Sequence, residues 1–246
     1  MSTDIKDLIR GGGYWRVIIR PTRNFYQKSL VSFNDLREIV KQAQVRKRGW
    51  YYPHIDDESL PAMSQQSIGS QVAFEGHNEY WELSSTGQFS HIFSMIEDTW
   101  VTPERAEQIK KGFHFHRDRA DSVQKFLEVV STVYRFTEIY LYASNLSQFG
   151  ELKKIDTWEV IVELHGVKDR MLFIEGFMRD LWSPYICNFE NDTISFRDDF
   201  TREEMIANSS EIAINKAIET FELFGWEKPN RKSLLDDQNK LLEMRF

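Results

Sequence analysis

The chain has 246 residues, of which 41% are hydrophobic and 14% are aromatic. This composition can bury a substantial core, and it excludes a disordered chain, which would contain few aromatic residues. No stretch approaches the roughly 20 apolar residues that a membrane-spanning helix needs, so we expect no membrane association. The first residues lack a signal-peptide pattern, and the single cysteine, Cys187, excludes an internal disulfide. These features predict a soluble, cytoplasmic protein.

The charges are distributed unevenly along the chain. The formal net charge is −7, yet residues 1–50 contain eleven Lys or Arg and only four Asp or Glu. Such asymmetry favours an anionic partner for the basic segment. The alternative is that this segment neutralises the acidic remainder of the chain across an internal interface.

A strand and a helix are predicted near the start of the chain. Residues 14–20 have a β-branched centre and are followed by Pro21, which cannot donate to a β-ladder, so they predict a short strand. Ser32 is followed by Asp35 three residues later, in a variant of the capping box. Apolar residues then recur at helical spacing, which predicts a helix to about residue 44.

The segment 44–59 combines cations, aromatic residues and an acidic cluster. Its cations are Arg46, Lys47 and Arg48. They suit the negative C-terminal end of the preceding helix, which Gly49 would end. Its aromatic residues are Trp50, Tyr51 and Tyr52. Because Pro53 keeps the residue before it extended, we expect a defined loop with at least one ring in the core and another facing solvent.

The remaining elements alternate between hairpins and helices. Hairpins are predicted at 80–96, around the turn at 165–169, and around the turn at 191–192. Helices are predicted from residue 102 to about 112, from 119 to 143, from 201 to 224, and from 233 to 246. Local hairpins favour the α+β class, with a mainly antiparallel sheet packed on a long central helix and C-terminal helices. The chain divides near residue 101 into portions 1–101 and 102–246, unless both share one core around the long helix.

A short histidine motif is the sharpest metal candidate. On a strand, His114, His116 and Asp118 would project to one side, and two imidazoles with a carboxylate suit zinc or another borderline metal. A further histidine would have to come from elsewhere in the chain. Ordinary solvated loop histidines are the alternative, and we expect no metal or cofactor.

No motif predicts a catalytic residue. The chain has no nucleophile elbow, P-loop or dinucleotide-binding glycine motif. His77 lies close to Glu79 and Glu82, and such a group can do acid–base work, although charges on an edge strand give the same pattern. We therefore expect a protein that is not an enzyme.

The basic, aromatic N-terminal part is the candidate ligand-binding surface. Arg16 and Arg20 project from the same face of the first strand, and arginine suits bidentate contacts with phosphate. Together with the 44–59 segment they could hold phosphates and stack bases. The predicted ligand-binding residues are Arg16, Arg20, Arg46, Lys47, Arg48, Trp50, Tyr51, Tyr52 and His54.

The sequence thus predicts a non-catalytic binding or accessory protein for a nucleotide or single-stranded nucleic acid. One alternative is an adaptor or homo-oligomer that makes protein contacts through its amphipathic C-terminal helix, since Leu234, Leu235, Leu241 and Leu242 form an apolar stripe. A second alternative is a metal-dependent hydrolase that uses His114, His116 and Asp118.

Overall fold

The fold is built around one antiparallel sheet that combines strands from both ends of the chain. The computed structural model describes residues 4–22, 29–56, 60–175, 179 and 181–244. In spatial order the strands are β2 (Ala62–Ser64), β3 (Ser67–Phe74), β4 (His77–Ser84), β5 (Phe89–Ser94), β1 (Tyr14–Pro21), β7 (Thr157–His165) and β9 (Thr193–Thr201). Strand β1 pairs with β5 on one side and with β7 on the other. The sheet therefore continues across the division expected near residue 101.

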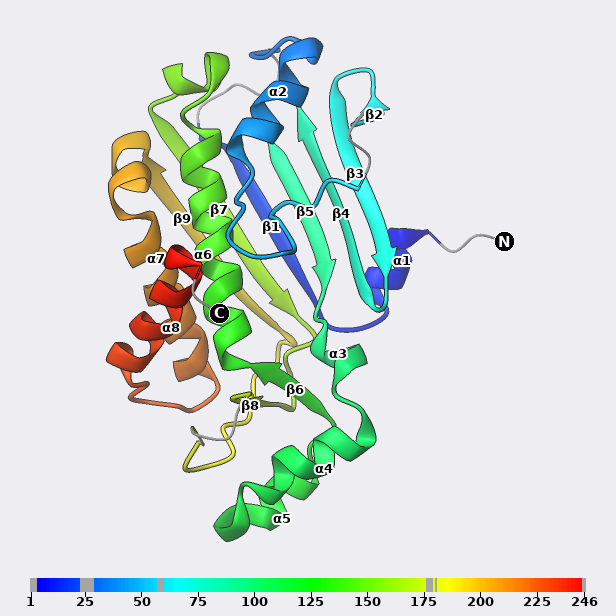
Figure 1. Cartoon of the computed structure of the whole chain (residues 1–246), viewed down its shortest axis with the longest axis vertical. Coiled ribbons are helices and arrows are strands. Elements are labelled where there is room, and N and C mark those ends of the chain that lie inside the picture. Colours follow the sequence, from blue (N-terminus) through cyan, green and yellow to red (C-terminus); the bar gives the residue numbers. More distant parts are fainter. Residues whose placement is uncertain (1–3, 23–28, 57–59, 176–178, 180, 245–246) are drawn as a thin grey trace.

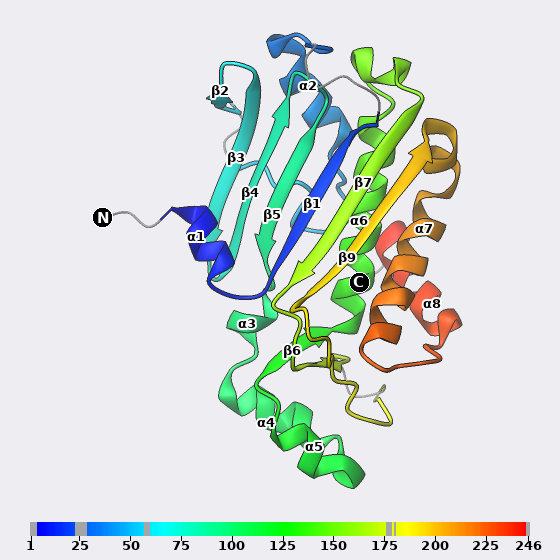
Figure 2. The same ribbon diagram turned by 180° about the vertical axis from the view of Figure 1, so that it is seen from behind.

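Helices cover one face of this sheet (Figure 1). The long helix α6 (Val129–Leu146) crosses it, with α2 (Phe33–Ala43), α7 (Arg202–Leu223) and α8 (Arg231–Glu243) on the same side. Figure 2 shows the other face, where the short helix α1 (Ile5–Arg10) lies over one end of the strands. The predicted α+β class with a mainly antiparallel sheet, a long helix and C-terminal helices is confirmed.

Alternation of side chains determines which face of each strand is covered. In β1 the side chains of Trp15, Val17 and Ile19 are buried, whereas Arg16 and Arg20, at positions of the opposite parity, are only half-buried. The same alternation buries every second residue of β4 and β5. The helix-covered face is therefore apolar and aromatic, and Trp15 meets Phe136 of α6 edge-on at 5.1 Å between ring centroids.

The long helix is shorter than its sequence pattern predicts. It begins at Val129, because the Glu128 side chain caps it by accepting a hydrogen bond from the backbone N–H of Ser131. Residues 125–128 form strand β6 (Lys125–Glu128), which pairs in parallel with β8 (Arg170–Phe173). The expected helix start at residue 119 was wrong because a short apolar run fits either a helix or a strand.

Two predicted hairpins also differ from the structure. The turn at 165–169 leads from β7 into β8, which leaves the main sheet to pair with β6. Residues 185–188 make only an isolated bridge, from Ile186 to Met171, and β9 pairs with β7 instead. The strand propensities were correct in both places, but propensity does not identify the partner strand.

Three small helices connect β5 to β6. They are α3 (Glu97–Trp100), α4 (Pro103–Lys111) and α5 (Arg117–Asp121), with a 3₁₀ turn at His114–His116. Figure 1 shows α4 and α5 projecting below the sheet. A second 3₁₀ turn, Gly150–Lys154, joins α6 to β7.

A fully buried arginine connects α3 to the sheet. Arg170 donates two hydrogen bonds of 2.6 Å to the two carboxylate oxygens of Asp98, and it also donates to the backbone carbonyls of Gly166 and Phe126. The Asp98 carboxylate accepts a further bond from the backbone N–H of Gly13. A Cβ at Gly13 would lie 1.9 Å from the Arg170 guanidinium, so only glycine fits there.

The C-terminal helix docks on its own chain. Leu234 and Leu241 of α8 are fully buried, Leu235 and Leu242 are half-buried, and the helix packs against α6 and α7. Its apolar stripe is therefore covered within the chain. No helix in the described ranges is long and apolar enough to cross a membrane.

Candidate functional site

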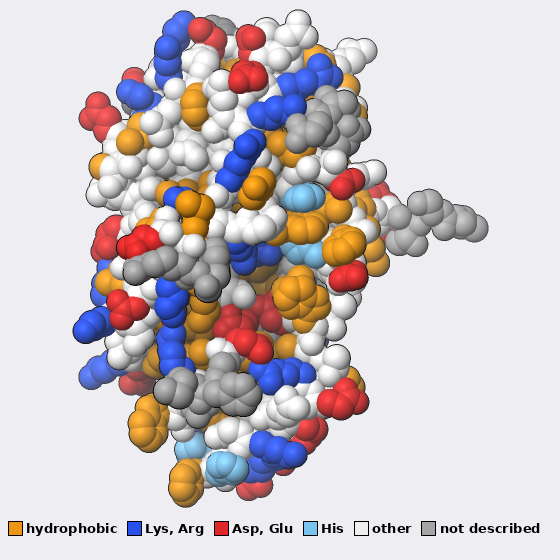
Figure 3. Space-filling model, viewed as in Figure 1, with side chains coloured by type: hydrophobic (Ala, Val, Ile, Leu, Met, Phe, Trp, Pro, Cys, Tyr) orange, Lys and Arg blue, Asp and Glu red, His pale blue; other side chains and the backbone are white. Residues whose placement is uncertain are grey.

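A pocket opens where the 44–56 loop, the ends of β3, β4 and β5, helix α3 and the first half of α6 meet. Its volume is about 190 Å³. We call it the Arg135 pocket, and it is lined by Trp15, Arg48, Trp50, Phe74, Glu75, His77, Ser94, Met95, Ile96, Glu97, Trp100, Ser131, Thr132 and Arg135. Figure 3 shows this face hollowed near its centre, with basic side chains lying deep in the hollow and hydrophobic and acidic side chains around it.

A larger cleft of about 740 Å³ adjoins the pocket. The two cavities share four lining residues: Ile96, Glu97, Trp100 and Ser131. The cleft continues past the N-terminal end of α6 toward Asp237 and Lys240 of α8. A ligand seated in the pocket can therefore extend into the cleft.

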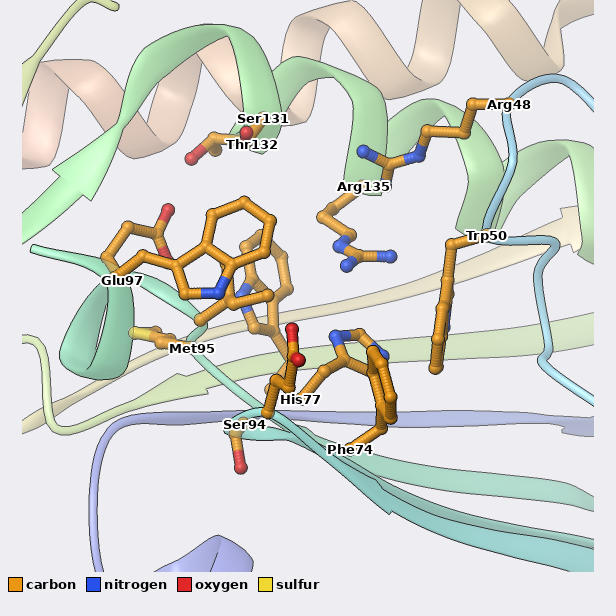
Figure 4. A pocket seen from close by; sticks show the side chains of 14 residues that line it. Arg48, Trp50, Phe74, His77, Ser94, Met95, Glu97, Ser131, Thr132 and Arg135 are labelled. Atoms are coloured by element: carbon orange, nitrogen blue, oxygen red, sulfur yellow. The ribbon is translucent and has the colours of Figure 1, made fainter. Parts of the chain in front are cut away.

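The 44–56 loop places two residues in the pocket. Helix α2 ends at Ala43, and Val45 then pairs with Tyr52 through two backbone hydrogen bonds of 2.7 and 2.9 Å. The Tyr52 ring is buried in the core, 5.1 Å from the ring of His91. Figure 4 shows Arg48 directed toward α6 and the Trp50 ring directed toward the sheet, on the side of Phe74 and His77.

Two arginines share one buried carboxylate. Arg48 binds Glu138 through both carboxylate oxygens, at 2.6 and 2.7 Å, and the Glu138 side chain is only 1% exposed. Arg135 reaches the same carboxylate at 3.4 Å, which is the one hydrogen bond of its side chain within the described residues. Figure 4 shows the Arg135 guanidinium directed into the pocket. One of its five N–H groups therefore has a protein acceptor within the described residues, and the guanidinium carbon lies 5.3 Å from the centroid of the Phe93 ring.

The Glu79 carboxylate organises the pocket wall. It accepts hydrogen bonds from Trp50 Nε1 at 3.1 Å, from the backbone N–H of His54 at 2.9 Å and from His77 Nε2 at 2.8 Å. Burial acts to raise the pKa of Glu79, but these bonds and the nearby His91 hold that pKa at about 2. Glu79 is therefore ionised at neutral pH and fixes both the indole of Trp50 and the imidazole of His77.

Two histidines beside Glu79 remain neutral at pH 7. Burial lowers the pKa of His77 below its usual value and that of His91 to about 4. His77 lines the pocket, whereas His91 lies behind it, with its Nε2 3.6 Å from the Glu79 carboxylate. Neither nitrogen of the His91 ring makes a hydrogen bond to the described residues.

The buried His91 makes the protein sensitive to acid. Its folded pKa of about 4 lies below the ordinary value of 6.5, so between these pH values the unfolded chain binds a proton that the folded chain does not. We expect the free energy of unfolding to fall by about 3 kcal/mol as the pH drops from 6.5 to 4. His91→Leu should reduce this loss in urea titrations, whereas His116→Leu, at an exposed position, should leave it unchanged. Equal pH slopes for the wild type and His91→Leu would contradict this origin.

Two buried carboxyl groups stand where the pocket meets the cleft. Burial raises the pKa of both Glu97 and Glu128. A Glu97 oxygen accepts a hydrogen bond from the backbone N–H of Glu128 at 3.1 Å, and Glu128 itself caps α6. Both residues therefore have structural roles, and Glu97 also presents its carboxyl group to the cavity (Figure 4).

The other predicted residues of the 44–59 segment lie outside the pocket. Arg46 and Tyr51 are exposed and lie against each other, with 5.6 Å between the guanidinium carbon and the ring centroid. Lys47 donates to the carbonyl of Leu242 at 2.9 Å, so this cation caps α8 and not α2. The His54 ring stacks on the Trp50 ring, with 3.9 Å between the ring centroids, and His54 does not line the pocket. The acidic residues 57–58 lie outside the described residues.

Arg16 and Arg20 are on the opposite face of the sheet. Arg16 pairs with Glu163 at 2.8 Å, and Arg20 pairs with Glu159 at 2.5 Å. Trp15 points to α6, and because side chains alternate along a strand, Arg16 and Arg20 point away from the helix and the pocket. The structure therefore does not bring them together with Arg48 and Trp50 into one surface.

The histidine motif is not arranged as a metal site. His114 and His116 belong to an exposed 3₁₀ turn and Asp118 to helix α5, so the strand geometry that would align them is absent. Within the described ranges, no group of three or more His, Cys, Asp or Glu side chains is placed to hold a metal ion. Cys187 is buried, and burial raises the pKa of its thiol.

Sequence reasoning missed Arg135 and Glu138. A signal was present, because these two are the only charged residues among the eighteen of α6. Charged residues three positions apart on an otherwise apolar helix lie on one face, and burial of that face requires partners.

No protein-family model matches this chain, and no curated protein or solved structure matches it either. Function is therefore inferred from the pocket alone.

Proposed function

We propose that this protein binds, without catalysis, a small organic anion that carries a planar ring, with a nucleotide as the ligand class. The observation that carries this proposal is the Arg135 guanidinium, which enters an aromatic-walled pocket with one long hydrogen bond to the described residues. The Arg135 side chain is only 13% exposed, and polar groups with so little access to solvent normally have acceptors for their donors. A phosphate or carboxylate group supplies several acceptors in the matching geometry.

The electrostatic surroundings of Arg135 support an anion. Burial lowers the pKa of its guanidinium, and the positive charge of Arg48 acts in the same direction. The Glu138 carboxylate is already bound at short distance by Arg48, so it compensates Arg135 weakly. An anion beside Arg135 would offset both unfavourable effects on this charge.

The walls of the pocket suit a planar ring. The orientation of the Trp50 indole is fixed by its hydrogen bond to Glu79 and by stacking on the His54 ring. Phe74 and Trp100 stand at the rim, with 56% and 64% of their surface exposed. Aromatic side chains of this kind stack on nucleobases with little dependence on which base is present.

The small size of the pocket, about 190 Å³, favours a mononucleotide over an extended strand. A strand binds along an open groove, whereas this pocket is bounded by the 44–56 loop, the sheet and α6 (Figure 4). The adjoining cleft provides room for the part of the ligand that the pocket does not hold. The exposed pair of Arg46 and Tyr51 remains the place where a single strand would contact the protein.

Calorimetric titration with AMP and adenosine tests the proposal. We expect AMP to bind and adenosine to bind about 10- to 150-fold more weakly, because charge-assisted hydrogen bonds contribute about 1.5–3 kcal/mol. An oligodeoxyadenylate without a terminal phosphate should bind no more tightly than adenosine. Equal affinity for AMP and adenosine, or the absence of binding by AMP, would contradict the proposal.

A protein-binding role is a second candidate, favoured by a different observation. Phe115 and Trp182 are 97% and 95% exposed, and large aromatic side chains at such exposure are typical of contact sites between proteins. Neither belongs to the C-terminal helix, whose apolar stripe is covered by the chain itself. Self-association through the surface around Phe115 would be supported by a mass in solution that rises with protein concentration in the wild type and is lower in Phe115→Ser.

A further inference from the structure

His77 is the second polar group that the pocket offers to a ligand. Its Nε2 lies 2.8 Å from the Glu79 carboxylate, which is ionised and can only accept hydrogen bonds. Nε2 must therefore carry the proton of the neutral ring, and Nδ1 must carry the lone pair. The other two donors to Glu79, Trp50 Nε1 and the backbone N–H of His54, hold the carboxylate in place, so the ring orientation is fixed.

The Nδ1 atom of His77 is available to a ligand. It makes no hydrogen bond to the described residues, and it is not among the polar atoms sealed from solvent. Figure 4 shows the imidazole beside the Arg135 guanidinium, in the space between Trp50 and Glu97. The pocket thus places a group that only donates hydrogen bonds next to an atom that accepts one.

We propose that Arg135 and His77 together make the pocket selective for a phosphate monoester over singly charged anions, an inference that rests on the proposed function. A phosphate monoester loses its second proton with a pKa of about 6, so near neutral pH it exchanges between one and two negative charges. Its P–O–H group can donate to Nδ1 while its other oxygens accept from Arg135. The proton can equally pass to Nδ1, which leaves a dianion between two cations.

Other anions cannot make both contacts at neutral pH. A phosphodiester, a sulfate ester and a carboxylate have no acidic proton left to give to Nδ1. Each of these anions can accept hydrogen bonds from Arg135. Its oxygen would, however, face the Nδ1 atom with a lone pair on both atoms, which is repulsive, unless His77 first took a proton from solvent. The energetic difference therefore concerns one hydrogen bond and one proton, and no covalent bond to phosphorus or carbon changes.

The charged groups around His77 are consistent with this exchange of a proton. The titratable and charged side chains in this region are Glu79 on β4, His91 on β5, Arg135 and Glu138 on α6, Arg48 and His54 on the 44–56 loop, Glu97 on α3, and Glu75 in the turn before β4. Burial lowers the pKa of His77, the hydrogen bond to Glu79 opposes that effect, and Arg135 and Arg48 add to it. A dianion beside the ring would raise the pKa.

Calorimetry at several pH values tests the selectivity with three matched ligands: AMP, adenosine 5′-sulfate and cyclic AMP. At pH 6.5 we expect AMP to bind at least tenfold more tightly than either singly charged ligand. As the pH rises from 6.5 to 8.5, the AMP affinity should fall by up to tenfold per unit, because the complex holds one proton that the free partners have lost. The affinities of the other two ligands should stay constant over this range.

Two histidine variants separate the role of His77 from a general effect. His77→Gln should bind AMP and adenosine 5′-sulfate equally and should take up no proton on binding. His116→Gln, at an exposed position that lines neither the pocket nor the cleft, should keep the selectivity of the wild type. If His77→Gln does not fold, proton uptake by the wild type, measured in buffers of different ionisation enthalpy, still decides the question.

The possible failures are distinguishable. Equal affinity of the wild type for AMP and adenosine 5′-sulfate, with both stronger than adenosine, would overturn the selectivity and leave the proposed function standing. Absence of binding by all three anions would overturn both. Selective binding of AMP without uptake of a proton would also overturn the role assigned to His77.

Discussion

Replacing Arg135 with glutamine is expected to weaken the binding of AMP by about 10- to 150-fold, the range that charge-assisted hydrogen bonds of about 1.5–3 kcal/mol produce. The side chain enters the pocket from the first half of α6, and its guanidinium donates one long hydrogen bond, to Glu138, in the described part of the chain. Glutamine keeps a polar group of similar length but removes the charge and the planar pair of donors. Titration calorimetry on the two proteins measures the difference.

Arg16→Gln is the matched control for this experiment. Arg16 lies on the opposite face of the sheet, where its side chain is 43% exposed and pairs with Glu163. The substitution is chemically identical, so any general effect of losing one positive charge appears in both variants. We expect the AMP affinity of Arg16→Gln to equal that of the wild type. An equal loss of affinity in the two variants would show that bulk charge, and not the pocket, attracts the nucleotide.

Asp98→Ala is expected to reduce the free energy of unfolding by about 3–5 kcal/mol, because it leaves a buried cation without its counter-ion. The Arg170 side chain is fully buried, and Asp98 accepts two of its hydrogen bonds in addition to the one from Gly13. The pair holds together the turn before β1, helix α3 and the β6–β8 pair. Urea denaturation followed by circular dichroism measures the loss.

Glu175→Ala provides the comparison for Asp98→Ala. Glu175 also pairs with an arginine, Arg105, at 2.5 Å, but these side chains are 64% and 36% exposed. Exposed ion pairs contribute little, so we expect a change below about 1 kcal/mol. Similar losses in the two variants would contradict the assignment of the Asp98–Arg170 pair as the buried link between α3 and the sheet.

Local sequence signals predicted much of the fold. Ser32 and Thr201 begin α2 and α7 as N-caps, and the capping box at Thr201 and Glu204 forms as expected. The alternation in residues 88–94 correctly placed Phe89, His91 and Phe93 on one buried face. These features depend on neighbours within a few residues, which is why sequence patterns are sufficient for them.

Pairings between distant segments could not be predicted in the same way. Strand β6 pairs with β8, about 45 residues later, and nothing in either short apolar run identifies the other. The helical spacing of Phe126 and Leu127 instead suggested that α6 began earlier. A choice between two periods over so few residues is decided by tertiary contacts.

The candidate site was predicted only in part. Arg48 and Trp50 were expected to bind a ligand, and the structure places both in the pocket. His77 and Glu79 were considered only as an acid–base group, and Arg135 and Glu138 were not expected to take part, because the pocket depends on contacts such as Arg48 with Glu138, which are 90 residues apart. The shared face of Arg16 and Arg20 was predicted correctly, but the sequence does not reveal on which side of the sheet the 44–56 loop lies.

A crystal structure of the protein grown with AMP tests the central claim most directly. We expect the phosphate oxygens to lie about 2.7–2.9 Å from the Arg135 guanidinium nitrogens, as in charge-assisted hydrogen bonds, with one oxygen at His77 Nδ1. The base should stack against Trp50. Density for AMP at the exposed Arg46 and Tyr51, with no nucleotide in the Arg135 pocket at saturating concentration, would contradict the proposed function.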